Sequence, residues 1–361
     1  MSKIISILFL LLGSTTIHAQ YVSLNKSEIE KLIALSKSDP VAKKNCKALE
    51  TVADMALLQT PGPVDTIISE GHLATDPKKI ITQKALSDMN KIYALAFAYK
   101  LTGRQEYVKK CIEFIVAWAR VNHGAGNPIN DTKLDPLLEG YDLIKNEIAE
   151  ADRKTINGWL MQVADAEITN PRFQSSNRSV YNNWNSHRIK VVGLIGYTLN
   201  NKAYEQFTDT SIKKQILENL YANGSGFDFE ERDALHYHIY TLEPLLKIAT
   251  VIKRANGVDY FAYTSAKNSS IQKSVAFLVP FATGEQVHHE FVNSKVAFDK
   301  KRADNHEPGY TIGADFKPQS AVEVLSLAAY FDPAYINTVK KMLNTSDINP
   351  NWQCVLNAVR N

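Results

Sequence analysis

Hydrophobic residues recur every three or four positions along most of this chain, a spacing that predicts amphipathic α-helices. Within residues 82–101 these positions include Ala85, Met89 and Ile92, and Gly103 interrupts the pattern. Alternation with a period of two is scarce, so the sequence predicts an all-α fold. The other predicted helices cover residues 26–57, 104–120, 135–168, 185–200, 211–222, 235–255, 270–282 and 318–344.

The predicted helices are of two kinds. The segment 189–197 (IKVVGLIGY) is apolar on nearly every side, which is typical of a helix that is covered all round. The helix at 104–120 is one-sided, with Lys109, Lys110 and Glu113 on its polar face. Buried helices that alternate with one-sided ones favour an (α/α) toroid or incomplete barrel, built from two layers of helical hairpins. A helical-repeat solenoid is the alternative, and the lack of a fixed repeat counts against it.

The first nineteen residues differ from the rest. Lys3 is followed by an apolar run over residues 4–12, and Ala19 ends the segment before Gln20. This layout predicts a secretory signal peptide at residues 1–19, because the apolar run is too short to span a bilayer. The mature protein is then expected in the periplasm or outside the cell. No linker divides residues 20–361, which are expected to form one domain.

Composition narrows the choice of partner. Hydrophobic residues make up 45% and charged residues 22% of the chain, which is typical of a folded protein with a large core. A net charge of +3 gives no overall attraction to nucleic acid or to a membrane surface. No later segment is long and apolar enough for membrane insertion. An acidic ligand would therefore meet a local cluster of basic residues. No heptad run indicates assembly, so the oligomeric state stays open.

Several common chemistries lack their motifs. Cys46, Cys111 and Cys354 match no zinc spacing, and their odd number leaves a single disulfide open at most. Cys111 lies in an apolar helical pattern, where a buried thiol is expected. The segment 288–290 (HHE) has metal-ligand residue types without a ligand spacing. There is no G-x-S-x-G turn and no phosphate-binding glycine loop. We therefore expect neither a metal nor another cofactor.

One polar segment directly precedes the apolar helix. Residues 181–188 read YNNWNSHR, and the start of a helix exposes backbone N–H groups that suit an anionic ligand. Asn183 and His187 are four residues apart, so they share a face if the helix has begun. The alternative is that Asn185 or Ser186 only caps the helix. A cap leaves the second Asn, the Trp, the His and the Arg unexplained, so a functional role is favoured.

A second segment, residues 230–246, carries more candidates. At about 100° per residue, Arg232, His236 and Tyr240 form one polar stripe, while the leucines gather on the opposite face. Tyr237 lies on the flank between the two faces. His238 leans toward the apolar side, where a histidine is usually a hydrogen-bonded core residue. A solvated helix face is the alternative interpretation of the stripe.

Together these segments resemble the alginate lyase family of helical-toroid polysaccharide lyases, over most of the mature chain. The pair Asn182-Asn183 is similar to the family's Asn-Asn-His motif. Residues 234–238 (ALHYH), followed by 242–245 (LEPL), are similar to its Ala-Leu-x-Tyr-His element and the apolar helix after it. Residues 134–143 (LDPLLEGYDL) also resemble these enzymes.

The resemblance implies β-elimination on a uronic-acid polymer, which needs no cofactor. Charge that builds on the uronate carboxylate must be neutralised, a base must take the C5 proton, and an acid must protonate O4. In mannuronate one tyrosine, here Tyr237, can serve as base and then acid. In guluronate His187 or His236 would be the base. The resemblance thus gives as candidate catalytic residues Asn183, His187, Arg232, His236 and Tyr237, and as candidate substrate-binding residues Asn182, Trp184, Tyr240 and Arg302.

Two departures from the family pattern keep alternatives open. Trp184 stands where the family has its His, and Glu230 stands where the family has its Arg. Arg232 or Arg302 would then supply the guanidinium. The expected substrate is alginate, with a preference for mannuronate-rich stretches. Another uronan such as glucuronan, a glycoside hydrolase on the same fold, and a non-catalytic uronan-binding protein of an uptake system are the alternatives.

Overall fold

The computed structural model describes residues 20–174 and 176–361, so the predicted signal peptide lies outside the described residues. The described chain is helical, and β-structure within it is limited to two isolated bridges. The α-helices are α1 (Lys26–Ser38), α2 (Pro40–Leu57), α3 (Pro77–Thr102), α4 (Gln105–Val121), α5 (Pro128–Asp131), α6 (Asp135–Ile144), α7 (Glu150–Thr169), α8 (Asn183–Leu199), α9 (Lys202–Asn219), α10 (Phe227–Arg232), α11 (Leu235–Asn256), α12 (Ile271–Ala282), α13 (Ala297–Asp304), α14 (Val322–Ala328), α15 (Tyr335–Leu343) and α16 (Trp352–Arg360).

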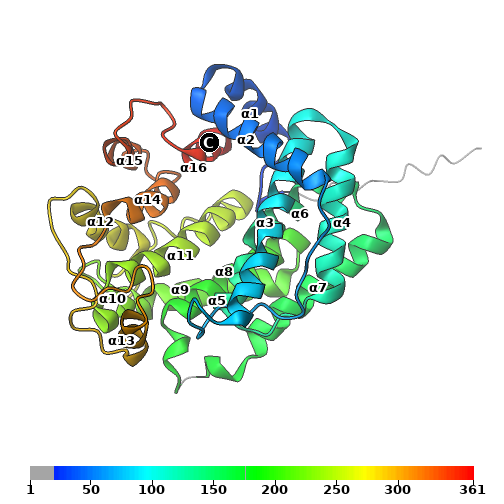
Figure 1. Ribbon diagram of the computed structural model, residues 1–361. Helices are drawn as coiled ribbons and strands as arrows, with labels where there is room; N and C mark the ends of the chain where they lie inside the picture. Colours follow the sequence, from blue (N-terminus) through cyan, green and yellow to red (C-terminus); the bar gives the residue numbers. More distant parts are fainter. Residues whose placement is uncertain (1–19, 175) are drawn as a thin grey trace, which may run out of the picture.

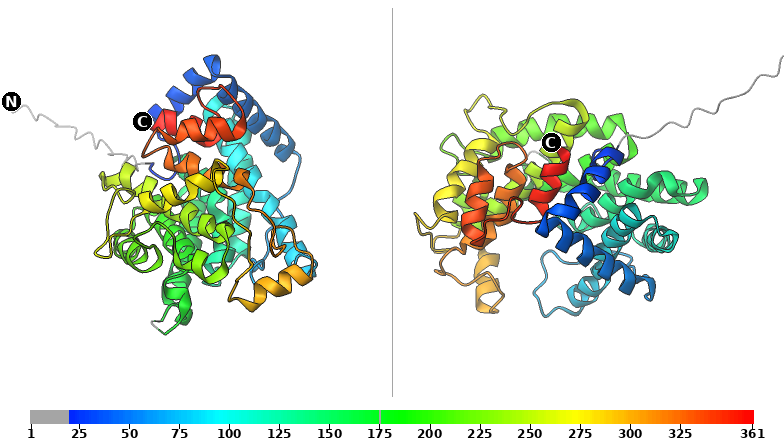
Figure 2. Two further views of the ribbon diagram at one scale, coloured as in Figure 1. Left: turned by 90° about the vertical axis from the view of Figure 1, so that its left-hand side faces the viewer. Right: turned by 90° about the horizontal axis from the view of Figure 1, so that it is seen from above.

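The helices are arranged in a ring (Figure 1). Consecutive helices pack as pairs, among them α2 with α3, α3 with α4 and α8 with α9. The ring is closed where α16 packs against α1, so the first and last helices of the described chain lie side by side (Figure 2). The predicted all-α toroid is therefore confirmed, and the described residues contain no helix long and apolar enough to cross a membrane.

Burial follows the two predicted layers. Nearly every side chain of α8 is buried, whereas α4 buries one face only. The helix α8 lies between α9 and α11, and glycine permits this close approach. A Cβ built on Gly193 would lie 2.4 Å from Ile248 Cδ1 and 2.8 Å from Thr208 Cγ2. The apolar character of α8 is thus explained by neighbours on opposite sides.

Several helix boundaries differ from the predicted ones, and local capping explains them. Asp39 caps a new helix at Pro40 and divides the predicted 26–57 segment. Asn201 caps α9, which begins nine residues before the predicted residue 211. The segments 135–168 and 318–344 are likewise divided. Gly103 ends α3 with φ +75°, as the pattern predicts. The helices α5, α10, α13 and α16 lie outside the predicted ranges.

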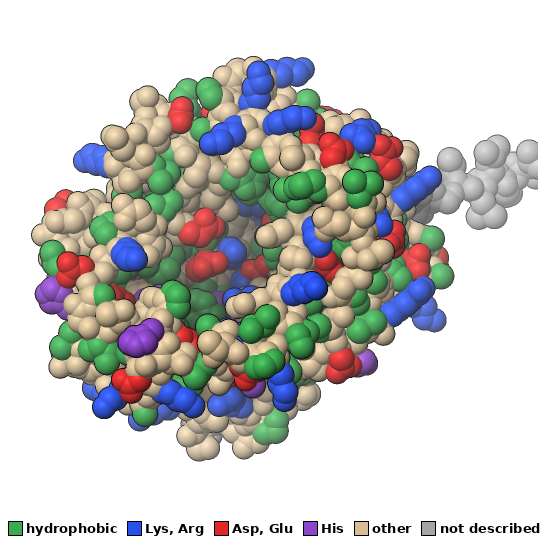
Figure 3. All heavy atoms as spheres, viewed as in Figure 1, with side chains coloured by type: hydrophobic (Ala, Val, Ile, Leu, Met, Phe, Trp, Pro, Cys, Tyr) green, Lys and Arg blue, Asp and Glu red, His purple; other side chains and the backbone are tan. Residues whose placement is uncertain are grey.

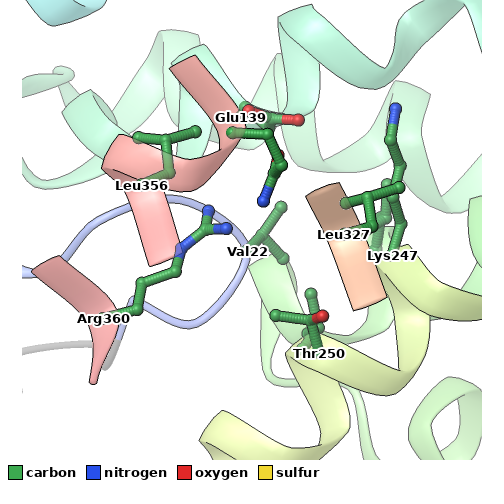
Figure 4. A pocket seen from close by; sticks show the side chains of 10 residues that line it. Val22, Glu139, Lys247, Thr250, Leu327, Leu356 and Arg360 are labelled. Atoms are coloured by element: carbon green, nitrogen blue, oxygen red, sulfur yellow. The ribbon is translucent and has the colours of Figure 1, made fainter. Parts of the chain in front are cut away.

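Buried charges hold the seam of the ring. Arg254 donates to the carbonyls of Tyr21 and Ser23 and pairs with Glu28, which fastens the start of the described chain to α11. Nearby, Glu139, Lys247 and Arg360 line a small cavity between α6, α11 and α16 (Figure 4). Burial raises the pKa of the Glu139 carboxyl, and the two cations oppose that shift.

Charged side chains of both signs gather inside the central hollow (Figure 3). In the inner helices, Lys190 pairs with Asp135, and Lys247 lies 3.1 Å from a Glu243 oxygen. Both cations come from helices of the inner layer, α8 and α11. Since each is matched by a carboxylate, the interior of the ring is not simply basic. A strong attraction for an anionic polymer must come from a more local site.

The close approach at α8 is testable. Gly193→Ala is expected to lower the free energy of unfolding by about 1–3 kcal/mol, because the new methyl group overpacks the contact with Ile248. Gly158→Ala in α7 is the matched control, since nothing lies within 4 Å of its Cβ. That control is expected to be stabilising by about 0.5–1 kcal/mol, because alanine favours a helix. Urea unfolding measures both, and equal effects would contradict the packing argument.

Candidate active site

A pocket of about 230 Å³ lies where the start of α8, the start of α11 and the helix α13 face residue 70. It collects aromatic rings, two arginines and a histidine from five separate segments of the chain. Its lining residues are Glu70, Ile129, Asn183, Trp184, Arg232, His236, Tyr237, Tyr240, Phe298, Arg302 and Tyr310. Seven of the nine predicted site residues are therefore among them; Asn182 and His187 are not.

Tyr237 lies at the centre of this pocket. Its hydroxyl accepts a hydrogen bond from Arg302 Nη1 at 2.9 Å and lies 3.3 Å from the Tyr310 hydroxyl. The Arg232 guanidinium stacks over its ring, 3.8 Å from the centroid. Burial raises the pKa of Tyr237 well above its ordinary value, while the two guanidiniums act to lower it. The pocket thus holds a protonated phenol between two cations.

Arg232 reaches the pocket in a different way from the predicted one. The sequence pattern placed Arg232, His236 and Tyr240 in one helical stripe, but the helix breaks between them. Arg232 ends α10, Asp233 adopts a left-handed conformation at φ 47°, and α11 begins at Leu235. The stripe is therefore wrong as a feature of one helix. The break nevertheless turns the Arg232 side chain over the Tyr237 ring, where it also pairs with Asp299.

Arg302 comes from α13, a helix that the pattern did not predict. One guanidinium nitrogen donates to both the Tyr237 and Tyr310 hydroxyls, at 2.9 and 3.0 Å. On its other side Arg302 Nε lies 3.7 Å from a Glu307 oxygen. Arg302 thus supplies the guanidinium nearest the Tyr237 oxygen. Glu230, at the family's arginine position, does not line this pocket.

The predicted anion site at the start of α8 is occupied by the protein's own carboxylate. Asp228 Oδ1 accepts hydrogen bonds from both the backbone N–H and the side-chain amide of Asn183. Its other oxygen accepts from Asn219 Nδ2 and Thr241 Oγ1, each at 2.8 Å. The Asn183 backbone N–H is therefore engaged within the protein, and a ligand at this helix start stays a prediction. Asn183 still lines the pocket, but with only one N–H of its amide left for a ligand.

His187 lies behind the pocket and does not line it. It is 3% exposed, its Nδ1 is 2.9 Å from Thr132 Oγ1, and its ring packs 4.2 Å from that of Tyr240. Burial and nearby lysines, Lys190 among them, hold the pKa of this imidazole well below its ordinary value. His187 Nε2 has no hydrogen-bond partner in the described chain. The geometry thus suits support of the Tyr240 ring better than contact with a ligand.

His236 does line the pocket. Burial lowers its pKa to about 4, and Arg302 and Arg232 act in the same direction. A neutral imidazole can accept a proton. The segment is held from outside, because Glu290 accepts hydrogen bonds from the Leu235 and His236 backbone N–H groups. Burial raises the pKa of that Glu290 carboxyl to about 7.

The remaining predicted residues divide between packing and binding. Asn182 is the N-cap of α8 and accepts from the Trp184 N–H, so its side chain is engaged in capping. The half-buried Trp184 lines the pocket under the Arg172 guanidinium, 4.1 Å from its ring. Tyr240 lines the pocket one turn beyond Tyr237. His238 is buried and hydrogen-bonded to the Ser274 carbonyl, as predicted for a core histidine.

Four lining residues were missed: Glu70, Ile129, Phe298 and Tyr310. Glu70 and Tyr310 come from loops, where no hydrophobic period marks a position as inward-facing. The basic stretch at residues 300–302 pointed to Arg302, but it did not reveal Phe298 four residues earlier on the same helix. In the described residues no group of three His, Cys, Asp or Glu side chains could hold a metal, and the three cysteines are buried and free.

The Asp228 network gives a stability prediction. Asp228→Ala leaves three buried donor side chains, those of Asn183, Asn219 and Thr241, without their acceptor. We expect the free energy of unfolding to fall by about 3 kcal/mol or more, because each unpaired buried donor costs about 1–3 kcal/mol. Asp152→Ala removes a surface partner of Arg120 and should cost less than about 1 kcal/mol. Denaturant unfolding of both variants checks this, and comparable losses would contradict it.

The buried histidines predict a loss of stability on acidification. The pKa of His238 falls from 6.5 to about 4 on burial, so the unfolded chain binds a proton that the folded chain excludes between these values. The stabilising term is complete above about pH 6.5 and is lost as the pH falls toward 4. His238→Gln keeps a donor for the Ser274 carbonyl and should show a shallower loss. Urea midpoints across this range test it, and parallel pH profiles would contradict it.

Comparisons with known proteins agree with the family resemblance seen in the sequence. A family model described as alginate lyase matches residues 34–288. An alginate lyase from Bacteroides ovatus shares 16% identity and a TM-score of 0.68 over 94% of this chain and 99% of that chain. Alginate lyase A1-III from Sphingomonas species A1 shares 19% identity and a TM-score of 0.57 over 75% and 80% of the two chains.

A histidine-to-alanine variant of A1-III, complexed with a tetrasaccharide, shares 18% identity and a TM-score of 0.59 over 88% of this chain and 90% of that chain. No curated protein sequence shows a significant match. At these identities the structural likeness establishes the fold, while the family model spans well over half of the chain. The chain therefore belongs to the alginate lyase family and is a polysaccharide lyase.

Proposed function

We propose that this protein cleaves mannuronate-rich alginate by β-elimination, with Tyr237 at the reacting carbon. The observation that carries the proposal is the position of the Tyr237 hydroxyl, 2.9 Å from Arg302 Nη1 and with Arg232 stacked on the same ring. A uronate carboxylate that enters this pocket meets two guanidiniums beside one phenol. Elimination needs that combination, because charge builds on the carboxylate as the C5 proton leaves.

The proton transfers can be assigned to groups in the pocket. In mannuronate the C5 proton and O4 lie on the same face, so one group can take the first and protonate the second. After its phenolic proton has passed to solvent, the Tyr237 phenolate, stabilised by Arg302 and Arg232, accepts the C5 proton. The C5–H and C4–O4 bonds break, a double bond forms between C4 and C5, and the same proton passes to O4. The balance is one proton moved and one double bond formed. The two guanidiniums act to lower the Tyr237 pKa against the effect of burial, and so reduce the cost of forming the phenolate.

A second base would be needed for guluronate, whose C5 proton and O4 are opposed. His236 is the better placed of the two predicted histidines, since it lines the pocket and its low pKa keeps it neutral. His187 lies behind Tyr240. Activity on guluronate would therefore rest on His236, with Tyr237 as the acid. Mannuronate needs only one catalytic group, because its C5 proton and O4 lie on the same face of the sugar. This is the basis of the proposed preference.

A hydrolytic mechanism has little support in the pocket. Hydrolysis of a glycosidic bond ordinarily uses two carboxylates that flank it. Of the residues that line this pocket only Glu70 carries a carboxylate, and the nearby Asp299 is paired with Arg232. The polymer is expected to meet the enzyme after export, since we also propose that residues 1–19 direct the protein to the periplasm or beyond.

The Tyr237 assignment is tested by Tyr237→Phe. Removing the hydroxyl should lower turnover of polymannuronate by about 10²–10⁴-fold, the usual range for loss of a general acid–base group. Ultraviolet absorbance of the unsaturated product measures the rate, with polyguluronate and glucuronan as parallel substrates. Tyr263→Phe is the control, because Tyr263 packs against Tyr260 and does not line the pocket.

The outcomes separate the alternatives. Faster cleavage of glucuronan or polyguluronate than of polymannuronate would overturn the substrate preference alone. New reducing ends without the absorbance would indicate hydrolysis, and binding without either signal would indicate a uronan-binding protein. Wild-type turnover in Tyr237→Phe would remove Tyr237 from the mechanism.

A further inference from the structure

A second hollow adjoins the active-site pocket on the other face of α10. It is larger, at about 350 Å³, and its lining is partly aromatic and partly charged. Three rings, those of Tyr181, Tyr221 and Phe227, are half-buried on its wall. The residues that line it belong to none of the steps assigned above.

The two hollows share three segments of the chain. Residues 178–184 place Tyr181 in the second hollow and Trp184 in the active-site pocket. The helix α10 places Glu230 on one side and Arg232 on the other. Residues 295–302 do the same, with Lys295 in the second hollow and Phe298 and Arg302 in the pocket. The second hollow therefore lies next to the reacting sugar's position rather than elsewhere on the surface.

The aromatic wall is held rigidly. The Tyr181 carbonyl accepts hydrogen bonds from Asn219 Nδ2 at 2.7 Å and Gln215 Nε2 at 3.3 Å. That Asn219 amide also donates to Asp228, the carboxylate that fixes Asn183 in the pocket. One network thus sets the positions of Tyr181 and Asn183 relative to each other. The Tyr221 N–H donates to the Ser225 carbonyl, which closes a tight turn.

The charges at the rim favour an anion on one side and oppose it on the other. Arg178 is exposed over 66% of its side chain, while its partner Glu231 is only 10% exposed, so the guanidinium is the accessible member of the pair. Lys295 is also exposed, and its Nζ lies 3.2 Å from the Glu230 carbonyl. The Glu230 carboxylate is exposed as well and accepts from Ser225 Oγ.

We infer that this second hollow is a binding subsite for a further uronate residue of the polymer, beyond the sugars at the cleaved bond. Tyr181 and Tyr221 offer ring faces for a sugar, and Arg178 and Lys295 offer cations for its carboxylate. Glu230 is an unfavourable neighbour that weakens this subsite. The inference rests on the proposed function, because only a polymeric acidic substrate would extend from the pocket into the hollow.

Three variants of the full mature chain test the inference, each assayed on polymannuronate and on the shortest mannuronate oligomer that is cleaved. For Lys295→Ala we expect kcat/KM on the polymer, relative to the oligomer, to fall roughly three- to tenfold, tenfold being about 1.4 kcal/mol. Lys300→Ala removes the same charge from an exposed position that lines neither hollow, and its ratio should stay at the wild-type value.

Glu230→Gln gives the opposite sign. Removing a carboxylate beside an anionic sugar should raise the same polymer-to-oligomer ratio, roughly two- to threefold, and added salt should reduce the gain because it screens exposed charges. A misfolded variant cannot produce such a gain, so the test does not depend on the stability of the Lys295 variant. Tyr181→Ala should lower the ratio as Lys295→Ala does.

The results distinguish the inference from the function on which it rests. If the wild-type protein forms no unsaturated product from any uronan, the proposed function fails and the subsite fails with it. If the wild-type protein cleaves the polymer but Lys295→Ala and Glu230→Gln both leave the ratio unchanged, only the subsite is overturned. Equal losses in Lys295→Ala and Lys300→Ala would also overturn it, because they would indicate a general charge effect.

Discussion

The buried carboxylate of Asp228 is the interaction on which the site depends. It lies in α10 and accepts hydrogen bonds from Asn183 in α8, Asn219 in α9 and Thr241 in α11. The side chain is 1% exposed, and burial of a charge is tolerated only when its hydrogen bonds are complete. Four helices are therefore fixed relative to one another by a single charged group.

The helix break after α10 determines where Arg232 lies relative to Tyr237. Because Asp233 takes a left-handed conformation and α11 starts afresh at Leu235, Arg232 can lie over the ring of Tyr237. On the opposite side α13 brings Arg302 to the phenol oxygen. The two cations reach Tyr237 from different elements, and each is oriented by a carboxylate, Asp299 or Glu307. Two positive charges are thus held beside the Tyr237 ring and hydroxyl. The described residues contain no group of side chains that could hold a metal ion.

The sequence predicts the fold better than the site. Long periodic segments such as 82–101 and the apolar α8 define the layered helical architecture, and Gly103 ends its helix as expected. The short helix α13 (AFDKKRAD) is mostly polar, so it has no stripe that a periodic pattern could reveal. Tyr310 lies in a loop, and its hydroxyl contacts Tyr237 and Arg302 from other segments of the chain. Such contacts depend on tertiary structure and leave no local signal.

The hydrogen bonding at the start of α8 also depends on tertiary structure. A helix start attracts an anion, and the sequence could not show that Asp228, forty-five residues later, provides it. The family resemblance did point to Asn183 and Tyr237, which the pocket brings together with Arg232 and Arg302. The separate roles of these residues stay predictions, since shared lining of a pocket does not by itself assign a proton transfer.

The central claim is that a uronate carboxylate binds between two guanidiniums while its C5 faces Tyr237. A crystal structure of the Tyr237→Phe variant with a mannuronate tetrasaccharide tests this most directly. The account predicts one sugar carboxylate within hydrogen-bond distance of Arg232 or Arg302, with C5 and O4 of the same sugar directed at the ring edge of residue 237. A tetrasaccharide bound elsewhere in the toroid, or with its carboxylates turned away from both arginines, would contradict it.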